Sequence, residues 1–452
     1  MKPNPTNKSN SEEKFKTFLR GKSGKFVKTE RLSLKCRFCG STNIVKFGYN
    51  ITKGWKKQRY KCCDCNVKFT PTSNLIKPIK FTSNDKDIQN NKTKELQKLC
   101  KLIKKNIYPF LNFPLHYTAK YDTNTFIDLL THVAMNHDFT ENGSKTFRFV
   151  KKERTPSADV LLYHISKFKP EEVKFMFQKV FEKIFEIANK NKVFKKRRLD
   201  VAIDLHDWLY YGDKNDPMVV ETKPKKGTTH CFRFATINIV ESGKRFTLLA
   251  LPMNVFDRKH KIVDELINYA KKKIKIGNVY VDRGFFSIKV IDVFKKHNLK
   301  FLMPAKKDRK IEQLVKNYDS PTIINYTLGG KYYIQGQTTF KLVIVNDENE
   351  IKRVFATNLH VNENNAHSLF GKYAKRWGIE TSYRVKQDFK ARTTSKRYVI
   401  RLFYFLFSAC LYNLWILVNI IVGMLILKFI PKEPFIRAKM FGIILYTFID
   451  HG

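Results

Sequence analysis

The sequence has few acidic residues for its length. It contains 40 Asp and Glu residues against 86 Lys and Arg residues in 452 positions, which gives a formal net charge of +46. A charge of this size opposes compaction and attracts polyanions, above all nucleic acid. An AT-rich coding sequence would account for part of the lysine excess, but not for the shortage of acids. The composition therefore predicts nucleic-acid binding and leaves any sequence preference open.

The first 16 residues, MKPNPTNKSNSEEKFK, lack an apolar stretch. A secretory signal peptide needs such a stretch, so we expect none. Cysteines are also scarce, with eight in the whole chain. In a long intracellular chain this number argues against a disulfide framework and for metal ligands or buried thiols. No internal repeat is visible either.

One segment lacks charge altogether. Residues 402–427, LFYFLFSACLYNLWILVNIIVGMLIL, are long enough to span a bilayer, and Arg401 and Lys428 flank them. A helix buried in a large protein core would also be apolar on all sides. Asn413 and Asn419 within the segment fit a packed protein interior better than lipid. We therefore expect a buried core or interface helix rather than a membrane span.

Composition and periodicity divide the chain into six segments. We predict a disordered basic tail (1–33), a cysteine module (34–71), a linker (72–94), a helical region for DNA binding or dimerisation (95–197), an α/β domain (198–430) with a β-rich insertion near 306–355, and a C-terminal tail (431–452). In the α/β domain, three strands are followed by a helix, a strand, a helix and a strand. This order is typical of a mixed sheet with flanking helices.

Two cysteine pairs define the N-terminal module. Cys36 and Cys39 form one C-x2-C pair, Cys62 and Cys65 form the other, and 22 residues lie between the pairs. Four thiolates in this pattern can surround Zn²⁺ tetrahedrally, and the metal supplies folding energy that so small a module lacks. The gap is slightly longer than usual, and a register that uses Cys63 stays open. We expect a structural zinc site.

Basic and aromatic residues alternate between the two cysteine pairs. Lys56, Lys57 and Arg59 lie among Trp55 and Tyr60 in the stretch GWKKQRYK. Such a mixture suits contact with DNA phosphates, and the alternative is a solvated hairpin tip. We predict that the three basic residues bind DNA.

Two acidic residues each follow an apolar stretch that reads as a strand. Asp204 ends the stretch VAID and Asp282 ends the stretch VYVD. A carboxylate in this position is costly unless something pairs with it, and sites in α/β sheets are built at strand ends. A third acid, Glu380, lies in the helical segment YAKRWGIETSYRVKQDF.

Glu380 shares one face of its helix with phenols and cations. At helical spacing this face carries Tyr373, Arg376, Glu380, Tyr383, Arg384 and Gln387. Such a face suits a phosphate backbone beside a metal ion. We therefore predict DNA contacts for its two tyrosines and two arginines.

Three acids from separate elements of so basic a chain predict a magnesium or manganese site. Hard cations prefer oxygen ligands, and two ions about 4 Å apart can activate a nucleophile and stabilise the leaving oxygen in phosphoryl transfer. On this hypothesis Asp204, Asp282 and Glu380 are catalytic and hold the metal ions. In the alternative, each acid caps a helix or pairs with a neighbour such as Arg283.

The order of these acids after a cysteine module resembles that of the DDE transposases of prokaryotic insertion sequences. The resemblance covers about residues 30–425 and rests on AIDLHD, VYVDRGFF and YAKRWGIETSYR. The last motif also resembles a Tyr-x2-Arg-x3-Glu-x6-Lys signature, in which Gln387 stands in place of the Lys. Lys386 comes one residue early, and Lys390 or Arg384 is the alternative for gripping a terminal phosphate.

The resemblance implies an α/β fold, an RNase H-like mixed sheet with flanking helices and a β-rich insertion, preceded by a zinc ribbon and an all-helical segment. It also implies hydrolysis at transposon ends and attack of the freed 3′-hydroxyl on target DNA, with Asp204, Asp282 and Glu380 as metal ligands. His206 and Asp207, beside the first acid, either contact substrate or have a structural role.

The expected partners are double-stranded DNA, as terminal inverted repeats and as target, and further copies of the chain in a homodimer or larger synaptic oligomer. The expected location is the cytoplasm, at the nucleoid. Two alternatives stay open: a zinc-ribbon DNA-binding protein with a catalytically inactive core, and a membrane-anchored protein that uses the uncharged segment.

Overall fold

The computed structural model describes residues 18–20, 26–28, 36, 39, 41–52, 55–69, 103, 105–151, 154–194, 198–329, 336–426, 429–434 and 436–450. The chain forms two compact units, residues 1–85 and 86–452. The predicted tail (1–33) and linker (72–94) lie outside the described residues, apart from the paired strands β1 (Phe18–Arg20) and β2 (Phe26–Lys28).

The first unit contains a three-stranded antiparallel sheet. Its strands are β3 (Ile44–Thr52), β4 (Trp55–Cys62) and β5 (Lys68–Phe69), in the order β3-β4-β5. Its small core consists of Cys36, Cys62 and Phe69, with Ile44, Tyr60 and Cys65 packed against them. A core of this size does not stabilise a fold without a metal or another staple.

The second unit begins with helices. They are η1 (Tyr108–Phe110), α2 (Thr123–Met135), α3 (Thr140–Lys151), α4 (Ala158–Ser166) and α5 (Pro170–Lys190). The apolar stripe of α5 is buried in the main core, including Val173, Phe177 and Ile184. The helices therefore share one core with the domain that follows.

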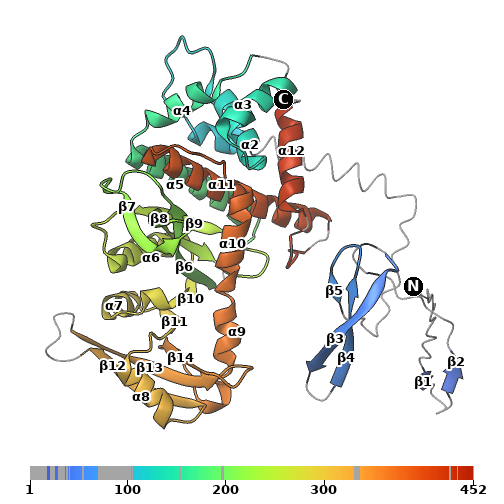
Figure 1. Ribbon diagram of the computed structural model, residues 1–452, viewed down its shortest axis with the longest axis vertical. Coiled ribbons are helices and arrows are strands. Elements are labelled where there is room, and N and C mark those ends of the chain that lie inside the picture. The colour runs from blue at the N-terminus through green and yellow to red at the C-terminus, as the bar shows by residue number, and fades with distance from the viewer. Residues whose placement is uncertain are drawn as a thin grey trace, which may run out of the picture. The chain divides into compact units, whose positions relative to one another are not determined.

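A nine-stranded mixed sheet forms the centre of the second unit (Figure 1). Its strands are β6 (Leu199–Leu209), β7 (Val219–Lys225), β8 (Thr228–Ile239), β9 (Thr247–Met253), β10 (Ile276–Val281), β11 (Lys300–Pro304), β12 (Thr322–Gly329), β13 (Gln337–Asn346) and β14 (Lys352–Thr357). The order is β12-β13-β14-β11-β10-β6-β8-β7, with β9 also paired to β8. Strands β6, β10 and β11 run parallel, and the other pairs are antiparallel.

Helices cover both faces of this sheet. The helical segments that follow β9 are α6 (Lys259–Lys273), η2 (Arg283–Phe285), α7 (Ile288–Lys296), α8 (Arg309–Asn317), η3 (Glu363–Asn365), α9 (Ser368–Ala374), α10 (Trp377–Asp388), α11 (Tyr398–Ile426) and α12 (Ala438–Asp450). Figure 1 shows α9 and α10 on one side of the sheet and α6 and α7 on the other.

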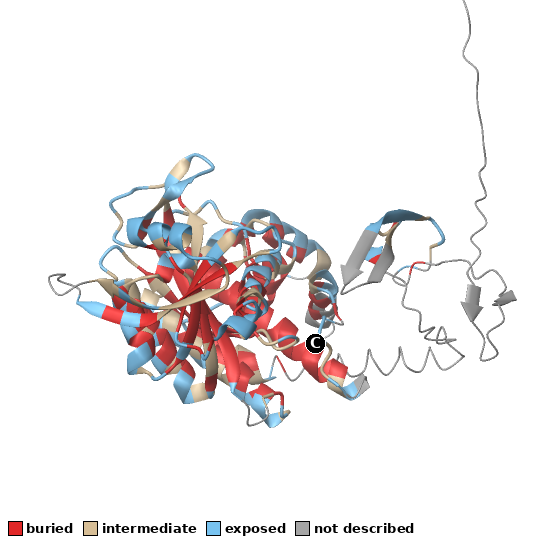
Figure 2. Ribbon diagram, turned by 90° about the horizontal axis from the view of Figure 1, so that it is seen from below, coloured by how far each residue is buried: buried red, intermediate tan, exposed pale blue. Residues whose placement is uncertain are grey.

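Side-chain alternation along the strands gives each face its own core. Val201 and Ile203 of β6 join the large core, whereas Ala202 joins a smaller core with Ile379 and Tyr383 of α10. Figure 2 shows buried residues concentrated in the sheet. The mixed sheet with flanking helices, preceded by a cysteine cluster, confirms the predicted fold class.

Two segments differ in detail from the sequence prediction. The predicted β-rich insertion near 306–355 forms α8 and strands β12, β13 and most of β14, and β14 pairs with β11, so it extends the main sheet. Residues 431–452, predicted as a tail, contain α12, which packs on α2 and α10.

Helix α11 is the uncharged segment of the sequence. Residues Tyr398–Leu425 are long and apolar enough to cross a membrane, but the most apolar part of this stretch is entirely buried inside the protein. The helix packs against α4, α5, α10 and β9. It therefore has the environment predicted for a core helix.

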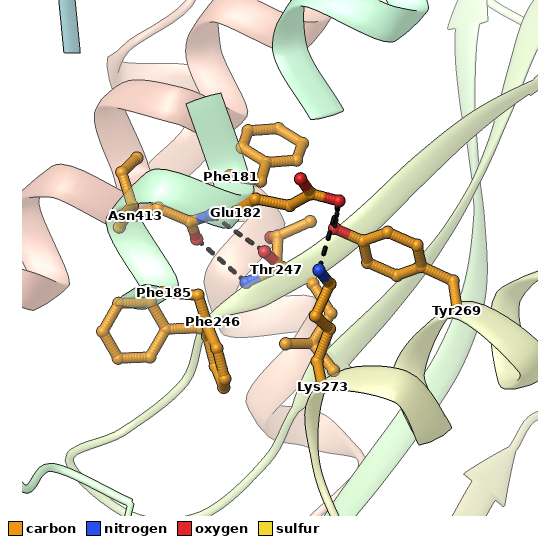
Figure 3. A pocket seen from close by; sticks show the side chains of 10 residues that line it. Phe181, Glu182, Phe185, Phe246, Thr247, Tyr269, Lys273 and Asn413 are labelled. Atoms are coloured by element: carbon orange, nitrogen blue, oxygen red, sulfur yellow. Dashed lines mark hydrogen bonds and ion pairs between the residues drawn. The ribbon is translucent and has the colours of Figure 1, made fainter. Parts of the chain in front are cut away.

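A side-chain amide fixes α11 to the sheet. Asn413 accepts a hydrogen bond from the backbone N–H of Thr247 at 2.9 Å and donates to its carbonyl at 2.8 Å. Figure 3 shows this contact beside Glu182, which pairs with Lys273 at 3.2 Å. The cavity between these groups measures about 10 Å³ and holds at most one water. It is a packing defect, not a ligand site.

Candidate active site

Two acids stand side by side on neighbouring parallel strands. Asp282 directly follows β10, as predicted, whereas Asp204, predicted at a strand end, lies within β6, because this strand continues to Leu209 in its pairing with β8. In the register of β6 and β10, Ile203 pairs with Val281. The residue that follows each of these in the chain is an acid, Asp204 or Asp282, and parallel strands lie about 4.8 Å apart. Both acids point to the face that α10 covers, because their side chains alternate with those of Ile203 and Val281.

Asp282 also closes the turn after its strand. Its Oδ1 accepts a hydrogen bond from the backbone N–H of Gly284 at 2.8 Å and caps η2. This is the capping role foreseen as the alternative to metal binding. It engages one carboxylate oxygen, and no hydrogen bond to the second oxygen is present among the described residues.

Arg376 lies between the first and third acids. Its Nη2 contacts Glu380 Oε1 at 2.5 Å, and its Nη1 lies 4.0 Å from Asp204 Oδ2. Its guanidinium lies over the Tyr373 ring, 5.4 Å from the centroid, and its Nε is buried without a hydrogen-bond partner. Arg376 thus lies between Glu380 of α10 and Asp204 of β6.

The three carboxylates influence one another electrostatically. Burial raises the pKa of Asp204 to about 7, and the charges of Asp282 and Glu380 add to this rise, while Arg376 opposes it. A set of oxygen donors that repel one another is well suited to a hard divalent cation. The site therefore fits the predicted metal in donor type and charge.

The ligand atoms of the three acids lie farther apart than those of the four cysteines. Within the part of the chain that the structure describes, the four cysteines are the one group of three or more candidate ligands whose ligand atoms all lie within 4.8 Å. The side chain of Glu380 is 53% exposed, whereas that of Asp204 is 14% exposed. A centre with two ions does not require all ligands to touch.

Asp207 has a structural role. It forms a two-point ion pair with Arg233, at 2.6 and 2.9 Å, and accepts a hydrogen bond from Thr222 at 2.7 Å. These contacts lower the pKa of Asp207 against the effect of burial. With its oxygens engaged in this way, Asp207 links β6 to β7 and β8.

His206 is a packing residue as well. Its ring stacks on Tyr383 at 4.8 Å and on Phe405 at 5.5 Å between centroids. Burial, with nearby Lys390 and Lys386, lowers the pKa of His206 to about 3, so the ring is neutral at physiological pH.

The predicted helix face lies on both α9 and α10, and it divides into a buried and an exposed part. Tyr383 is buried, and its hydroxyl lies 2.5 Å from Thr236 Oγ1, which leaves it no access to DNA in this conformation. Tyr373 is half-buried, with its hydroxyl 3.4 Å from the carbonyl of Val281. Arg384 is exposed, and Arg376 is held by the acids as described above.

The three candidates for a phosphate-gripping cation lie in different surroundings. Lys386 is buried, donates to Asn238 Oδ1 at 3.2 Å and has its pKa lowered to about 7 by burial. Lys390 is also almost fully buried, 4.1 Å from the Trp208 ring centroid. Gln387 lies 3.5 Å from His206. Arg384 alone is exposed.

Sequence reasoning missed Lys259, the first residue of α6. Its Nζ donates to the carbonyl of Gly284 at 2.5 Å. Burial lowers the pKa of Lys259, while the charge of Asp282 opposes this effect. The residue therefore supplies a cation beside the second acid. Nothing in its local sequence distinguishes it from the many other lysines.

The four predicted zinc ligands converge in the first unit. The sulfurs of Cys36 and Cys65 lie 3.5 Å apart, as do those of Cys39 and Cys62, and all four lie within 4.8 Å of one another. Sulfurs around zinc, with Zn–S bonds of about 2.3 Å, are separated by about 3.8 Å. The group fits zinc without Cys63, which is exposed.

The predicted DNA-binding residues of this unit lie on β4. In the β3–β4 pairing, Lys56 is opposite Ile51 and Lys57 is opposite Asn50. The side chains of both lysines lie outside the described residues, and Arg59 is half-buried. Their contacts with DNA stay a prediction.

One family matches part of the chain. Residues 244–414 match the family described as "Transposase DDE domain". The DDE-domain match includes Asp282 and Glu380, and Asp204 precedes it. A comparison with curated protein sequences found no match.

A solved structure resembles most of the chain. The chain is similar to a piggyBac transposase in a cryo-EM structure of its synaptic complex with hairpin DNA, with a TM-score of 0.52. The sequences are 12% identical, and the match covers 79% of this chain and 81% of the other. At this identity the likeness is one of fold. Together the two findings support a DDE transposase.

Proposed function

We propose that the protein is a DNA transposase of an insertion sequence, which cleaves the ends of its element and joins the freed 3′-hydroxyl to target DNA. The observation that carries this proposal is the register of β6 and β10, which sets Asp204 beside Asp282. Arg376 then links Asp204 to Glu380 on α10. The match to the DDE domain family supports it.

The three acids would hold two Mg²⁺ or Mn²⁺ ions. When bound, such ions activate the attacking hydroxyl or water and stabilise the leaving oxygen. The protein's own residues orient this site: Arg376 positions Glu380, and the Gly284 backbone holds Asp282. Lys259 adds positive charge beside Asp282, where it would attract a phosphate.

Double-stranded DNA is the proposed partner, both as terminal repeat and as target. The net charge of +46 supports it, because counterion release from DNA favours binding by so basic a chain. The similar piggyBac transposase was seen in a synaptic complex with hairpin DNA. By analogy we propose that this chain acts as a homodimer or larger synaptic oligomer. From its basic charge alone we also propose that it acts in the cytoplasm at the nucleoid.

The test is cleavage of the DNA that flanks the gene. We expect cleavage and strand joining in Mg²⁺ or Mn²⁺, and a loss of about 100-fold or more in Asp204→Asn, Asp282→Asn and Glu380→Gln, a scale known for groups that stabilise transition-state charge. DNA binding should persist in all three. Asp388→Asn is the matched control, since Asp388 is an exposed acid at the other end of α10.

A second candidate is a zinc-ribbon DNA-binding protein with an inactive core. The observation that favours it is that Asp282 caps η2 and Glu380 pairs with Arg376, so two of the acids already have protein partners. Specific DNA binding by the wild type without cleavage in either metal would select this candidate over the transposase.

A further inference from the structure

A cavity of about 160 Å³ lies behind the helix that carries Glu380. Its wall comes from α10, α11, the β8–β9 turn and the segment after α11. The lining residues are Gly243, Arg245, Thr381, Ser382, Val385, Tyr412, Trp415, Ile416, Asn419, Ile420, Pro431, Lys432, Glu433 and Pro434. Most of this surface is apolar, and Arg245 stands among it.

Close packing at glycines shapes this cavity. Gly243 has φ +73° and approaches the carbonyl of Pro431 so closely that an added Cβ would lie 2.4 Å from it. Gly423 of α11 packs on Pro431 in the same way, with 2.5 Å between an added Cβ and Cδ. The wall formed by Pro431 is therefore held from two sides, and the cavity has a defined shape.

Arg245 lines the cavity, and one of its nitrogens has no hydrogen-bond partner. It packs on α10 at Gly378, where an added Cβ would lie 2.8 Å from its Nε. That Nε is buried and has no hydrogen-bond partner. Within the described residues the guanidinium forms no ion pair, although Glu433 lines the same cavity. A buried guanidinium nitrogen without a partner is costly.

We propose that this cavity binds a small organic anion. Its charged group is a carboxylate, and its body is aromatic or branched aliphatic. The carboxylate pairs with Arg245, whose planar fork matches its two oxygens. The body occupies the apolar part, since a cavity of about 150 Å³ accommodates a benzene ring. A DNA phosphate does not fit, because its hydrated sugar backbone has no partners among Val385, Trp415 and Ile416.

The site lies directly behind the proposed active site. Thr381, Ser382 and Val385 line the cavity, and Thr381 follows Glu380 on α10. An occupant would brace this helix from the side opposite the sheet acids. Binding itself does not depend on the proposed function, so its test succeeds or fails independently of transposition.

The test uses benzoate as the probe and benzamide as its neutral counterpart, with the full-length protein and titration calorimetry or ligand-observed NMR. We expect benzoate to bind at least tenfold more tightly than benzamide. This comparison needs no variant. Equal affinities for the two compounds would overturn the proposal. So would the absence of benzoate binding at concentrations up to about 20 mM, which is 20-fold above a Kd of about 1 mM.

Variants locate the site. Arg245→Met should weaken benzoate binding at least tenfold, and Val385→Phe, which fills the cavity, should abolish it. Arg309→Met is the matched control, because Arg309 is exposed on α8, and it should bind like the wild type. Circular dichroism confirms folding of each variant. Unchanged binding in folded Arg245→Met contradicts the assignment.

Discussion

At the residue scale, Asp204 is a carboxyl group held where its charged form is unfavourable without a cation. Its pKa rises to about 7 from an ordinary value of 3.8, first through burial and then through the neighbouring acids. The unfolded chain loses this proton near pH 4, whereas the folded protein keeps it to about pH 7. The free energy of unfolding of the metal-free protein therefore falls as the pH rises through this window.

We predict that Asp204→Asn stabilises the metal-free protein at pH 8. The variant carries no charge to desolvate, so it should gain up to about 4 kcal/mol in the free energy of unfolding over the wild type. The measurement is urea denaturation in EDTA at pH 4 and pH 8. At pH 4 the two proteins should be nearly equal.

We predict that Asp207→Asn changes the free energy of unfolding in the opposite direction. The pKa of Asp207 is lowered, so its charge stabilises the fold above pH 4, and its removal should destabilise the protein at pH 8.

Adding Mg²⁺ should stabilise the wild type and leave Asp204→Asn unchanged. If Asp204→Asn is no more stable than the wild type at pH 8 in EDTA, the charge of Asp204 is not destabilised by burial and by repulsion from the neighbouring acids.

At the element scale, the junction between α9 and α10 is tied to the base of the sheet. Lys375 lies at this junction, and its Nζ contacts Asp200 Oδ2 at 2.6 Å. Asp200 also accepts hydrogen bonds from Asn278, through its backbone and side chain, and from Tyr280. Gly277 leaves room for this carboxylate, since an added Cβ would lie 2.7 Å from its Oδ1.

We predict that Lys375→Met raises the Mg²⁺ concentration needed for half-maximal cleavage by about tenfold, because loss of a residue that orients metal ligands has this scale of effect. The next residue is Arg376, so a looser junction displaces Glu380 from the other acids. Lys372→Met, one turn earlier and without an ion pair among the described residues, is the control. An Mg²⁺ titration identical to the wild type would show that the junction does not position the site.

Local sequence patterns were sufficient to propose the acids but not their arrangement. In the sequence, Asp204 and Asp282 are visible as acids after apolar stretches, and alternation predicts the face on which each lies. Their proximity depends on the pairing of β6 with β10, which joins positions 78 residues apart and is set by the whole sheet. Helical spacing likewise grouped Tyr383 with Arg384, although one is buried and the other exposed.

The uncharged helix shows a related limit. Composition alone does not distinguish a membrane span from a core helix. Asn413 indicated a core helix, and in the structure its amide forms hydrogen bonds with the backbone of Thr247. Helix α12 was missed for a different reason. Its 13 residues follow a proline-containing stretch and are held by α2 and α10, contacts that no local pattern reveals.

At the scale of the whole molecule, the two units are stabilised by different means. The second unit has a large apolar core that spans sheet and helices. The first has six residues in and around its core, three of them cysteines of the thiol cluster. Loss of a metal should therefore affect one unit and leave the other intact, since a small metal module unfolds without its ion.

We predict that purified protein contains one zinc per chain and that a zinc-selective chelator unfolds the first unit alone. In hydrogen exchange, peptides from residues 41–69 should lose protection, whereas peptides from β6 and α11 should keep theirs. Cys36→Ser should reproduce the effect, and Cys63→Ser should not, because Cys63 lies outside the cluster. Zinc-free protein with full protection over 41–69, or loss of protection that spreads into the central sheet, would contradict this division of the molecule.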